Sequence, residues 1–108
     1  MLKKVNRLAK AKDINTTFAR GRTFFNPFFT IKHLPSPEGL KFAVVVSTKV
    51  FKKAHDRNRL KRLVREALRA NLTRFKVGNY MIMAKPKISS LPEEKWQEQF
   101  LSLVKAIK

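Results

Sequence analysis

The stretch AHDRNRLKRLVREALR, residues 54–69, decides the fold of this chain. Its apolar side chains recur at intervals of three or four residues, which places them within an arc of roughly 140° on one side of an α-helix. An arc of that width is typical of a helix face buried on a core. We therefore expect an amphipathic helix over about residues 54–73. The side chains predicted to be buried are Leu60, Leu63, Val64, Ala67 and Leu68.

The opposite side of the predicted helix is almost entirely cationic. Residues 49–76 contain eleven basic and two acidic side chains. A helix that only faces solvent usually pairs Lys or Arg with Glu four residues away, because each pair stabilises it by about 0.2–0.5 kcal/mol. Most of those acids are missing here, and most cations within the helix are Arg, whose guanidinium can bind phosphate through two parallel hydrogen bonds. The pattern favours a nucleic-acid-binding surface over a merely soluble helix face.

The composition of the whole chain also indicates an anionic partner. The 108 residues carry 25 Lys and Arg against 7 Asp and Glu, a formal net charge of +18. The usual partners of such a protein are nucleic acids, anionic membranes or acidic proteins. A helix lying on a membrane would need for lipid the same apolar face that the core needs, so we expect no membrane partner. The absence of Cys and of a secretory leader favours a cytoplasmic location.

The N-terminal half predicts a short helix followed by extended chain. We expect a helix over residues 11–21, AKDINTTFARG, ended by Gly21 in a left-handed conformation. Residues 23–34 favour two short strands or one broken strand, because Asn26 and Pro27 interrupt the run and Pro has no N–H for a sheet.

The C-terminal half predicts two strands around the basic helix, and then a final helix. LKFAVVVS, residues 40–47, is typical of a strand covered on both faces, and NYMIMAK, residues 79–85, of a second buried strand. Ser90 and Glu93 have the spacing of a helix capping box, with Pro92 in the first turn. The final helix has one apolar face, formed by Trp96, Phe100, Leu103, Val104 and Ile107. The order α-β-β-β-α-β-α predicts a small α+β sandwich with a single sheet, occupying residues 1–108 as one domain.

The predicted strands contain more Phe side chains than one sheet face of this size can bury. Side-chain alternation sends Phe29 and Ile31 to one face. It sends Phe28, Thr30 and Lys32 to the other. Two interpretations of this second face stay open: the N-terminal helix covers it, or it forms a partly open groove in which unpaired bases stack on Phe.

The chain lacks the patterns that carry hydrolytic chemistry. His33 and His55 have no second His or carboxylate at ligand spacing, which argues against a zinc site. No nucleophile motif, phosphate-binding Gly-rich loop or pair of catalytic carboxylates occurs. We expect that any phosphodiester cleavage in which the protein takes part is performed by another molecule.

Residues 46–69, VSTKVFKKAHDRNRLKRLVREALR, resemble the signature of the protein subunit of bacterial ribonuclease P. The hallmark of that family is an Arg-Asn-Arg motif followed by further basic residues. The matching positions are Arg57, Asn58, Arg59, Lys61, Arg62 and Arg65. Weaker matches extend the resemblance over nearly the whole chain: NRL at 6–8, Phe18, Gly21, Phe29, KFAVVVS at 41–47 and NYMIMAK at 79–85.

The resemblance implies a fold and a function for the chain. The implied fold is an α/β sandwich like the second domain of ribosomal protein S5, with a left-handed βαβ crossover around the basic helix. In the family a large RNA subunit performs the hydrolysis with Mg²⁺, and the protein is a non-catalytic subunit. The implied partners are the catalytic RNA and precursor tRNA, whose 5′ leader is removed. We expect a monomeric protein in a 1:1 complex with the RNA.

Residue roles follow from the same resemblance. The predicted RNA-binding surface consists of Arg57, Asn58, Arg59, Lys61, Arg62, Arg65, Arg69, Lys49, Lys52 and Lys53, with Lys49 at the edge of the leader cleft. The predicted leader cleft, between the sheet and the first helix, consists of Ile14, Phe18, Thr30 and Lys32. Thr48 stands where the family usually has Lys, and Ala43 where Gly is common. Two other kinds of protein would fit the same basic composition. One is a ribosomal-type structural RNA-binding protein with no role in cleavage, and the other is a DNA-binding module that places its Arg-rich helix in the major groove.

Overall fold

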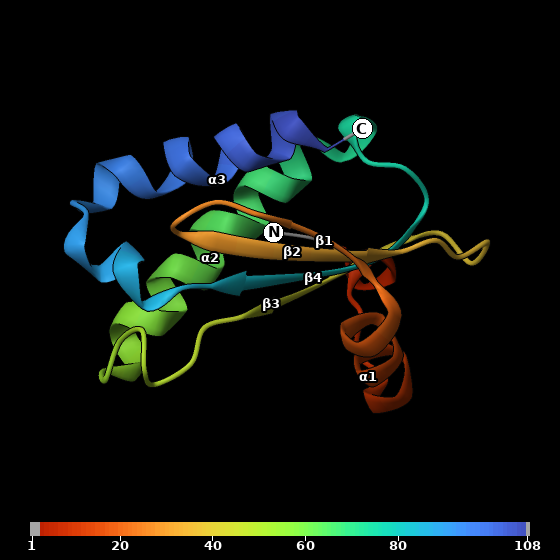
Figure 1. The fold of residues 1–108 in the computed structure, drawn as a ribbon, viewed down its shortest axis with the longest axis horizontal. Helices are drawn as coiled ribbons and strands as arrows, with labels where there is room; N and C mark the ends of the chain where they lie inside the picture. Colours follow the sequence, from red (N-terminus) through yellow and green to blue (C-terminus); the bar gives the residue numbers. More distant parts are fainter. Residues whose placement is uncertain (1–2, 108) are drawn as a thin grey trace.

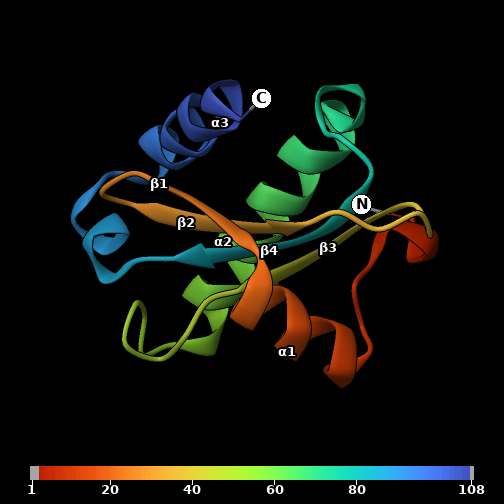
Figure 2. The same cartoon turned by 45° about the vertical axis from the view of Figure 1, so that its right-hand side comes forward.

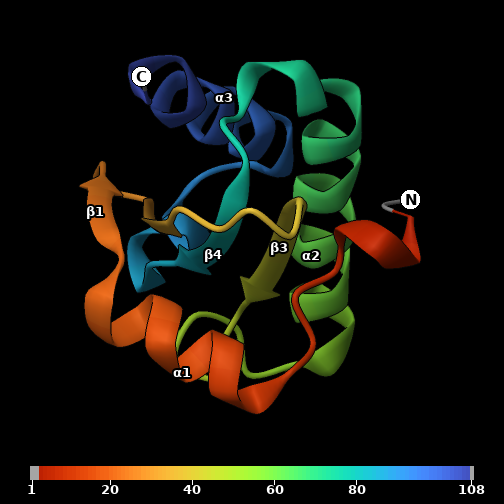
Figure 3. The same cartoon turned by 90° about the vertical axis from the view of Figure 1, so that its right-hand side faces the viewer.

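The computed structural model describes residues 3–107, in which one sheet lies between helices on its two faces (Figure 1). The order of helices and strands is the predicted one. The main elements are α1 (Ala11–Arg20), β1 (Arg22–Phe25), β2 (Phe29–Leu34), β3 (Leu40–Val45), α2 (Ala54–Ala70), β4 (Gly78–Ala84) and α3 (Trp96–Ala106). Four 3₁₀ turns accompany them: η1 (Lys4–Asn6), η2 (Leu72–Arg74), η3 (Pro86–Ser90) and η4 (Glu93–Lys95). Helix α1 lies on one face of the sheet, and α2 and α3 on the other (Figures 2 and 3).

The sheet has the strand order β1-β2-β4-β3. Strands β1 and β4 both pair antiparallel with β2, and β3 pairs parallel with β4. The prediction that residues 40–47 form a strand covered on both faces is therefore wrong. Strand β3 is an edge strand, in which Phe42 is buried but Val45 is 40% exposed. The covered strand is β4, where residues 78–82 are all buried.

Helix α2 connects the two parallel strands. In Figure 1 the chain runs from right to left along β3 and again along β4, and α2 returns from the lower left to the upper right. Figure 3, seen from the right of that view, shows β4 to the left of β3 and α2 to its right. This path makes the βαβ crossover left-handed, as the resemblance implied. The crossover sets the whole of α2 against the face of the sheet that α3 also covers.

The core fills the space between the sheet and helices α2 and α3. Phe29 and Ile31 of β2 point into it, as alternation predicted, and Phe29 meets Phe100 of α3 with ring centroids 5.4 Å apart. Tyr80 and Ile82 of β4 join them. Each such side chain contributes about 1.5–3 kcal/mol when fully buried. The sheet face that carries Thr30 and Lys32 is left to α1.

The turn between β1 and β2 resolves the alternatives for residues 23–34 in favour of two strands. The side-chain oxygen of Asn26 accepts hydrogen bonds from the backbone N–H groups of Phe28 and Phe29, both at 2.8 Å. Its amide nitrogen donates to the carbonyl oxygen of Gln99 at 3.0 Å. Asn26 therefore forms the turn and also fixes it to α3.

The predicted capping box at the start of the final helix is wrong. The Ser90 hydroxyl donates to the carbonyl oxygen of Lys87 at 2.7 Å, inside the preceding turn η3. Glu93 instead forms an ion pair with Arg59 of α2. Pro92 has extended backbone angles and precedes η4, so α3 begins only at Trp96. The apolar face was predicted correctly, since Trp96 and three further side chains of α3 are buried: Phe100, Leu103 and Val104.

Gly21 ends α1, but not through the left-handed conformation that we expected. Its φ and ψ are −66° and 146°, which any residue can adopt. The reason for Gly is close approach: a Cβ built there would clash with the carbonyl oxygen of Thr17 and lie 3.2 Å from the backbone nitrogen of His33. Gly21 therefore lets the end of α1 lie directly against β2. No helix within residues 3–107 is both long and apolar enough to cross a membrane.

Replacing Gly21 by Ala should destabilise the protein by about 1–3 kcal/mol, the usual range for forcing an extra methyl group into a packed site. Urea unfolding of the two proteins measures this difference. Ala19→Ser adds one heavy atom to an exposed position of the same helix and should change stability by less than about 0.5 kcal/mol. Equal stability of Gly21→Ala and the parent protein would refute the close-approach explanation.

Candidate nucleic-acid interface

Helix α2 presents its cations to solvent because its apolar side is fully used by the core. Leu60, Val64 and Leu68 are 0% exposed, and Ala67 is 1% exposed. Leu63 is partly buried and packs against the same cluster. The predicted buried face is therefore confirmed.

Four of the six predicted cations on α2 form no ion pair with a carboxylate among residues 3–107: Arg57, Lys61, Arg62 and Arg65. Arg62 is exposed, whereas Lys61 and Arg65 are partly buried along their side chains. In two other cases the guanidinium meets an acid: Arg59 lies 3.2 Å from Glu93, and Arg69 lies 3.0 Å from Glu66. All four of these side chains are about half exposed. Exposed pairs of this kind contribute only about 0–1 kcal/mol, so a phosphate can replace the carboxylate at little cost.

Arg57 has a structural role that the sequence pattern did not reveal. Its Nη1 donates to the carbonyl oxygens of Phe51 and Lys52, at 2.9 and 2.8 Å. Both acceptors lie in the loop between β3 and α2. The first Arg of the Arg-Asn-Arg motif therefore holds this loop against the start of α2, while Asn58 beside it is exposed.

The loop itself carries the three predicted lysines. Lys49, Lys52 and Lys53 are all exposed. Val50 is buried, and the Phe51 ring meets Trp96 with centroids 5.3 Å apart, so apolar side chains anchor the loop that displays the lysines. The placement of Lys49 at the cleft edge stays a prediction.

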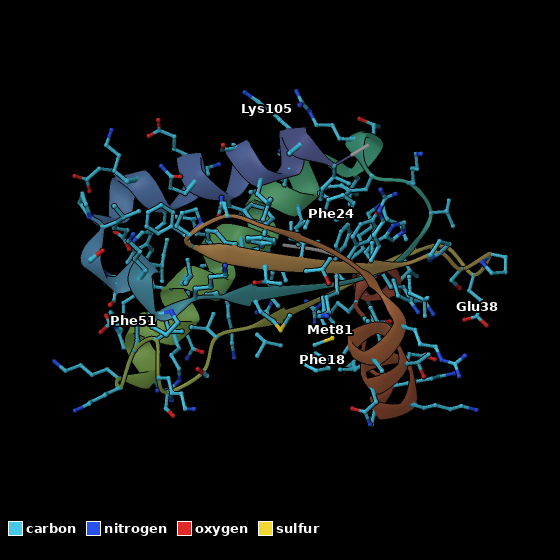
Figure 4. All side chains as sticks on the ribbon, in the orientation of Figure 1. Phe18, Phe24, Glu38, Phe51, Met81 and Lys105 are labelled. Atoms are coloured by element: carbon cyan, nitrogen blue, oxygen red, sulfur yellow. The ribbon has the colours of Figure 1, made fainter. Side chains whose placement is uncertain are left out.

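The predicted cleft residues lie together on the α1 side of the sheet. Pairing places Thr30 opposite Met83, and Lys32 opposite Met81, so these side chains share one face. The Lys32 Nζ lies 5.1 Å from the centre of the Phe18 ring, which is 52% exposed. In Figure 4, Phe18 and Met81 both lie below the sheet, on its α1 side. This face is therefore only partly covered by α1.

The two methionines are the cleft residues that sequence reasoning missed. Met81 is 5% exposed and Met83 is partly buried. The period of two in NYMIMAK could have placed both opposite the core-facing residues Tyr80 and Ile82. They give the cleft an apolar floor.

A cavity of about 340 Å³ lies at the β3 edge, between α1 and α2. Ile14 of α1, Ala43 and Val45 of β3, and Arg65 of α2 are among the residues that line it. Ala43 lies directly opposite Met81 on β4, so the cavity continues the cleft face beyond the β3 edge. One predicted cleft residue, Ile14, and one predicted RNA-binding residue, Arg65, therefore line the same cavity.

His33 and Tyr80 are two titratable side chains of the sheet that lie against each other. The His33 ring stacks on Tyr80 with centroids 4.2 Å apart, and burial lowers the pKa of His33 below its ordinary value. Burial raises the pKa of Tyr80 to about 12, and its hydroxyl donates to the carbonyl oxygen of Lys76. Within residues 3–107 no group of three or more His, Cys, Asp or Glu side chains could hold a metal ion. The arrangement can bind a polyanion and stack unpaired bases.

Comparisons with known proteins agree with this geometry. A family model described as Ribonuclease P matches residues 2–108. The chain is 33% identical over 104 residues to the ribonuclease P protein component of Bacillus velezensis, covering 94% of this chain and 89% of that one. It is 26% identical over 107 residues to the same component of a Nitratiruptor species, covering 99% and 96%.

Solved structures show the same fold. The RNase P protein from Thermotoga maritima superimposes with a TM-score of 0.81 at 28% identity, covering 94% of this chain and 97% of that one. The Staphylococcus aureus RNase P protein gives a TM-score of 0.86 at 19% identity, covering 94% of each chain. At that lower identity the likeness concerns the fold alone.

Replacing Arg57 by Lys should loosen the β3–α2 loop while keeping its charge. The guanidinium bonds to two carbonyl oxygens at once, and hydrogen bonds from a charged donor contribute about 1.5–3 kcal/mol each. Amide hydrogen exchange at Val50 and Phe51, which donate to Ser47, should accelerate at least tenfold. Arg62→Lys is the matched control and should leave these rates unchanged. If both variants exchange like the parent protein, Arg57 does not hold the loop.

Proposed function

The chain belongs to the ribonuclease P protein family, and from this premise we propose that it binds both the catalytic RNA subunit and the 5′ leader of precursor tRNA. In this role it assists the endonucleolytic removal of the leader during tRNA 5′ maturation. Membership of the family implies an RNA partner in the holoenzyme. The assignment of individual residues to the two RNAs is our proposal.

One observation supports the proposal: a residue of the predicted cleft and a residue of the basic face of α2 border the same cavity. Arg65 from α2 and Ile14 from α1 line the same cavity. Two RNAs can therefore contact this protein side by side, one on the cations of α2 and the other in the cleft. A ribosomal-type structural protein needs only the first of these surfaces.

On the α2 side, we propose that phosphates of the catalytic RNA meet the cationic side chains of the helix and its loop. Each neutralised phosphate releases condensed counterions, which favours binding and makes it depend on salt. The same positive charge lowers the repulsion between the catalytic RNA and its tRNA substrate. Asn58, which is neutral, would contribute a hydrogen bond. The residues that would contribute charge are the nine predicted cations: Arg57, Arg59, Lys61, Arg62, Arg65, Arg69, Lys49, Lys52 and Lys53.

In the cleft, we propose that the leader lies as an unpaired strand along the α1 side of the sheet. The half-exposed Phe18 ring offers a stacking surface, and the Lys32 ammonium beside it can contact a phosphate. The Met81 side chain below them adds apolar contact. Stacking on Phe does not read base identity, so this binding tolerates many leader sequences.

Hydrolysis itself is assigned to the RNA subunit. The described side chains include no cluster of carboxylates or histidines that fits Mg²⁺, so the ions that the reaction needs would be held mainly by the RNA. The protein contributes binding and orientation. We further propose a cytoplasmic location and a 1:1 complex of one protein with one RNA.

A holoenzyme reconstituted from this protein and the catalytic RNA should bind precursor tRNA about tenfold more tightly than mature tRNA at low Mg²⁺, because only the precursor has a leader for the cleft. Equilibrium binding of the two tRNAs measures the ratio. Cleavage of the precursor at the same low Mg²⁺ should require the protein. Equal affinities would refute leader binding, and cleavage unaffected by the protein would favour the ribosomal-type alternative.

The double variant Arg62→Gln and Arg65→Gln should weaken assembly with the catalytic RNA and flatten its salt dependence. Each lost contact to a duplex phosphate reduces the slope of log affinity against log salt by about 0.9. Lys105→Gln removes one exposed charge from α3 and is the matched control. If Lys105→Gln changed the slope half as much as the double variant, which removes twice as many charges, only total charge would matter.

A further inference from the structure

We propose that Phe25 and Lys85 form a second base-stacking site for the leader, on the same sheet face as Phe18 and Lys32 but farther along the strands. The inference rests on the proposed function and names a further contact of the same RNA strand. Neither residue belongs to the four cleft positions that the sequence indicated.

The geometry of this second pair repeats that of the first. The Lys85 Nζ lies 4.8 Å from the centre of the Phe25 ring, and the Lys32 Nζ lies 5.1 Å from the centre of the Phe18 ring. The Phe25 ring is 69% exposed, more than Phe18 at 52%. An aromatic ring beside an ammonium suits an unpaired nucleotide, because the ring can stack on the base and the ammonium can contact its phosphate.

Sheet pairing places the two sites on one face. Phe25 lies opposite Thr30, and Thr30 lies opposite Met83, so all three side chains point to the α1 side. Lys32 is two residues from Thr30 along β2, a rise of about 7 Å. A single strand rises about 3.4 Å per stacked nucleotide, so one leader can reach both pairs within a few nucleotides.

The backbone around the second pair is fixed. The N–H of Lys85 donates to the carbonyl oxygen of Phe28 at 2.8 Å, which ties the end of β4 to the start of β2. The N–H of Asn26 donates to the carbonyl oxygen of Phe29 at 3.0 Å, directly after Phe25. The ring and the ammonium are therefore carried by a rigid part of the sheet, which lowers the entropy lost when a nucleotide binds.

The charge of the surroundings decides what the exposed ring binds. Lys87 approaches the neighbouring Phe28 ring, with its Nζ 6.0 Å from the ring centre, and adds a second cation at this end of the sheet. An apolar ring beside an ammonium group complements a nucleic-acid strand better than an apolar protein surface. Neither the Phe25 ring nor the Phe28 ring has a polar atom that could distinguish one base from another, so the site should accept any base.

The test combines protein variants with leaders that lack one base. Holoenzyme is reconstituted with the parent protein, Phe25→Ala or Phe18→Ala. Its affinity is measured for precursor tRNAs that carry an abasic nucleotide at successive leader positions. Phe25→Ala should weaken binding of the intact precursor at least fivefold, within the range for loss of one base–aromatic stack. That loss should vanish at one abasic position, which should differ from the position that cancels the Phe18→Ala loss.

Two controls separate stacking from folding. Phe25→Leu keeps an apolar side chain without a ring and should bind the precursor like Phe25→Ala. Val77→Ala removes another exposed apolar side chain, at the opposite end of β4, and should bind like the parent protein. Thermal unfolding of each variant shows whether the fold is retained.

The outcomes distinguish this inference from the function on which it rests. If the parent holoenzyme prefers precursor over mature tRNA but Phe25→Ala binds every leader like the parent, the second site is refuted and the function stands. A Phe25→Ala loss that no abasic position cancels, or that the same position cancels as for Phe18→Ala, also refutes a separate site. If the parent protein gives no preference for the precursor, both the function and the inference fail.

Discussion

The burial of one helix stripe determines the rest of this structure. Leu60, Val64 and Leu68 are fully enclosed between the sheet and α3, and each contributes about 1.5–3 kcal/mol. Crowding like charges on the opposite side of α2 costs only a few tenths of a kcal/mol per pair. Hydrophobic burial therefore dominates, and it holds the cations together on an outward face. In the free protein the cationic side chains on this face repel one another, and the phosphates of a bound RNA relieve that repulsion.

The acidic residues are distributed to leave that face cationic. Three of the seven Asp and Glu residues of the chain, Glu93, Glu94 and Glu98, lie in η4 and α3. The ion pair between Arg59 and Glu93 marks the border between the two regions. The surface of α2 and its loop therefore differs in charge from the surface of α3, and an approaching RNA is directed to one side of the molecule. The left-handed crossover brings this side next to the α1 cleft.

Most of the fold could be predicted from the sequence, because periodicity and turn residues act locally. The apolar stripe of α2, the break at Asn26 and Pro27, and the apolar face of α3 were all confirmed. The errors concern features that depend on neighbours far along the chain. Strand β3 reads as a covered strand, yet β4 takes the central position, and Glu93 has capping-box spacing, yet it pairs with Arg59 instead. The role of Gly21 is likewise set by its approach to β2, which no local pattern reveals.

Less of the site can be compared with the structure. Charge clustering correctly placed the cations on the outward face of α2, whereas the roles of this face and of the cleft in RNA binding stay predictions. The contacts of Arg57 depend on the path of an irregular loop, for which the sequence has no periodic pattern. The position of Phe25 beside Lys85 depends on sheet register, which the sequence did not specify.

Chemical acylation of the lysines, read by mass spectrometry in the free protein and in the complex with the catalytic RNA, tests the central claim most directly. We expect the RNA to slow modification of the exposed lysines around α2 and to leave Lys105 on α3 unchanged. The lysines expected to be protected are Lys49, Lys52, Lys53 and Lys61. Protection of Lys105 with unchanged reactivity of these four would show that RNA binds the other side of the molecule, and would contradict the account.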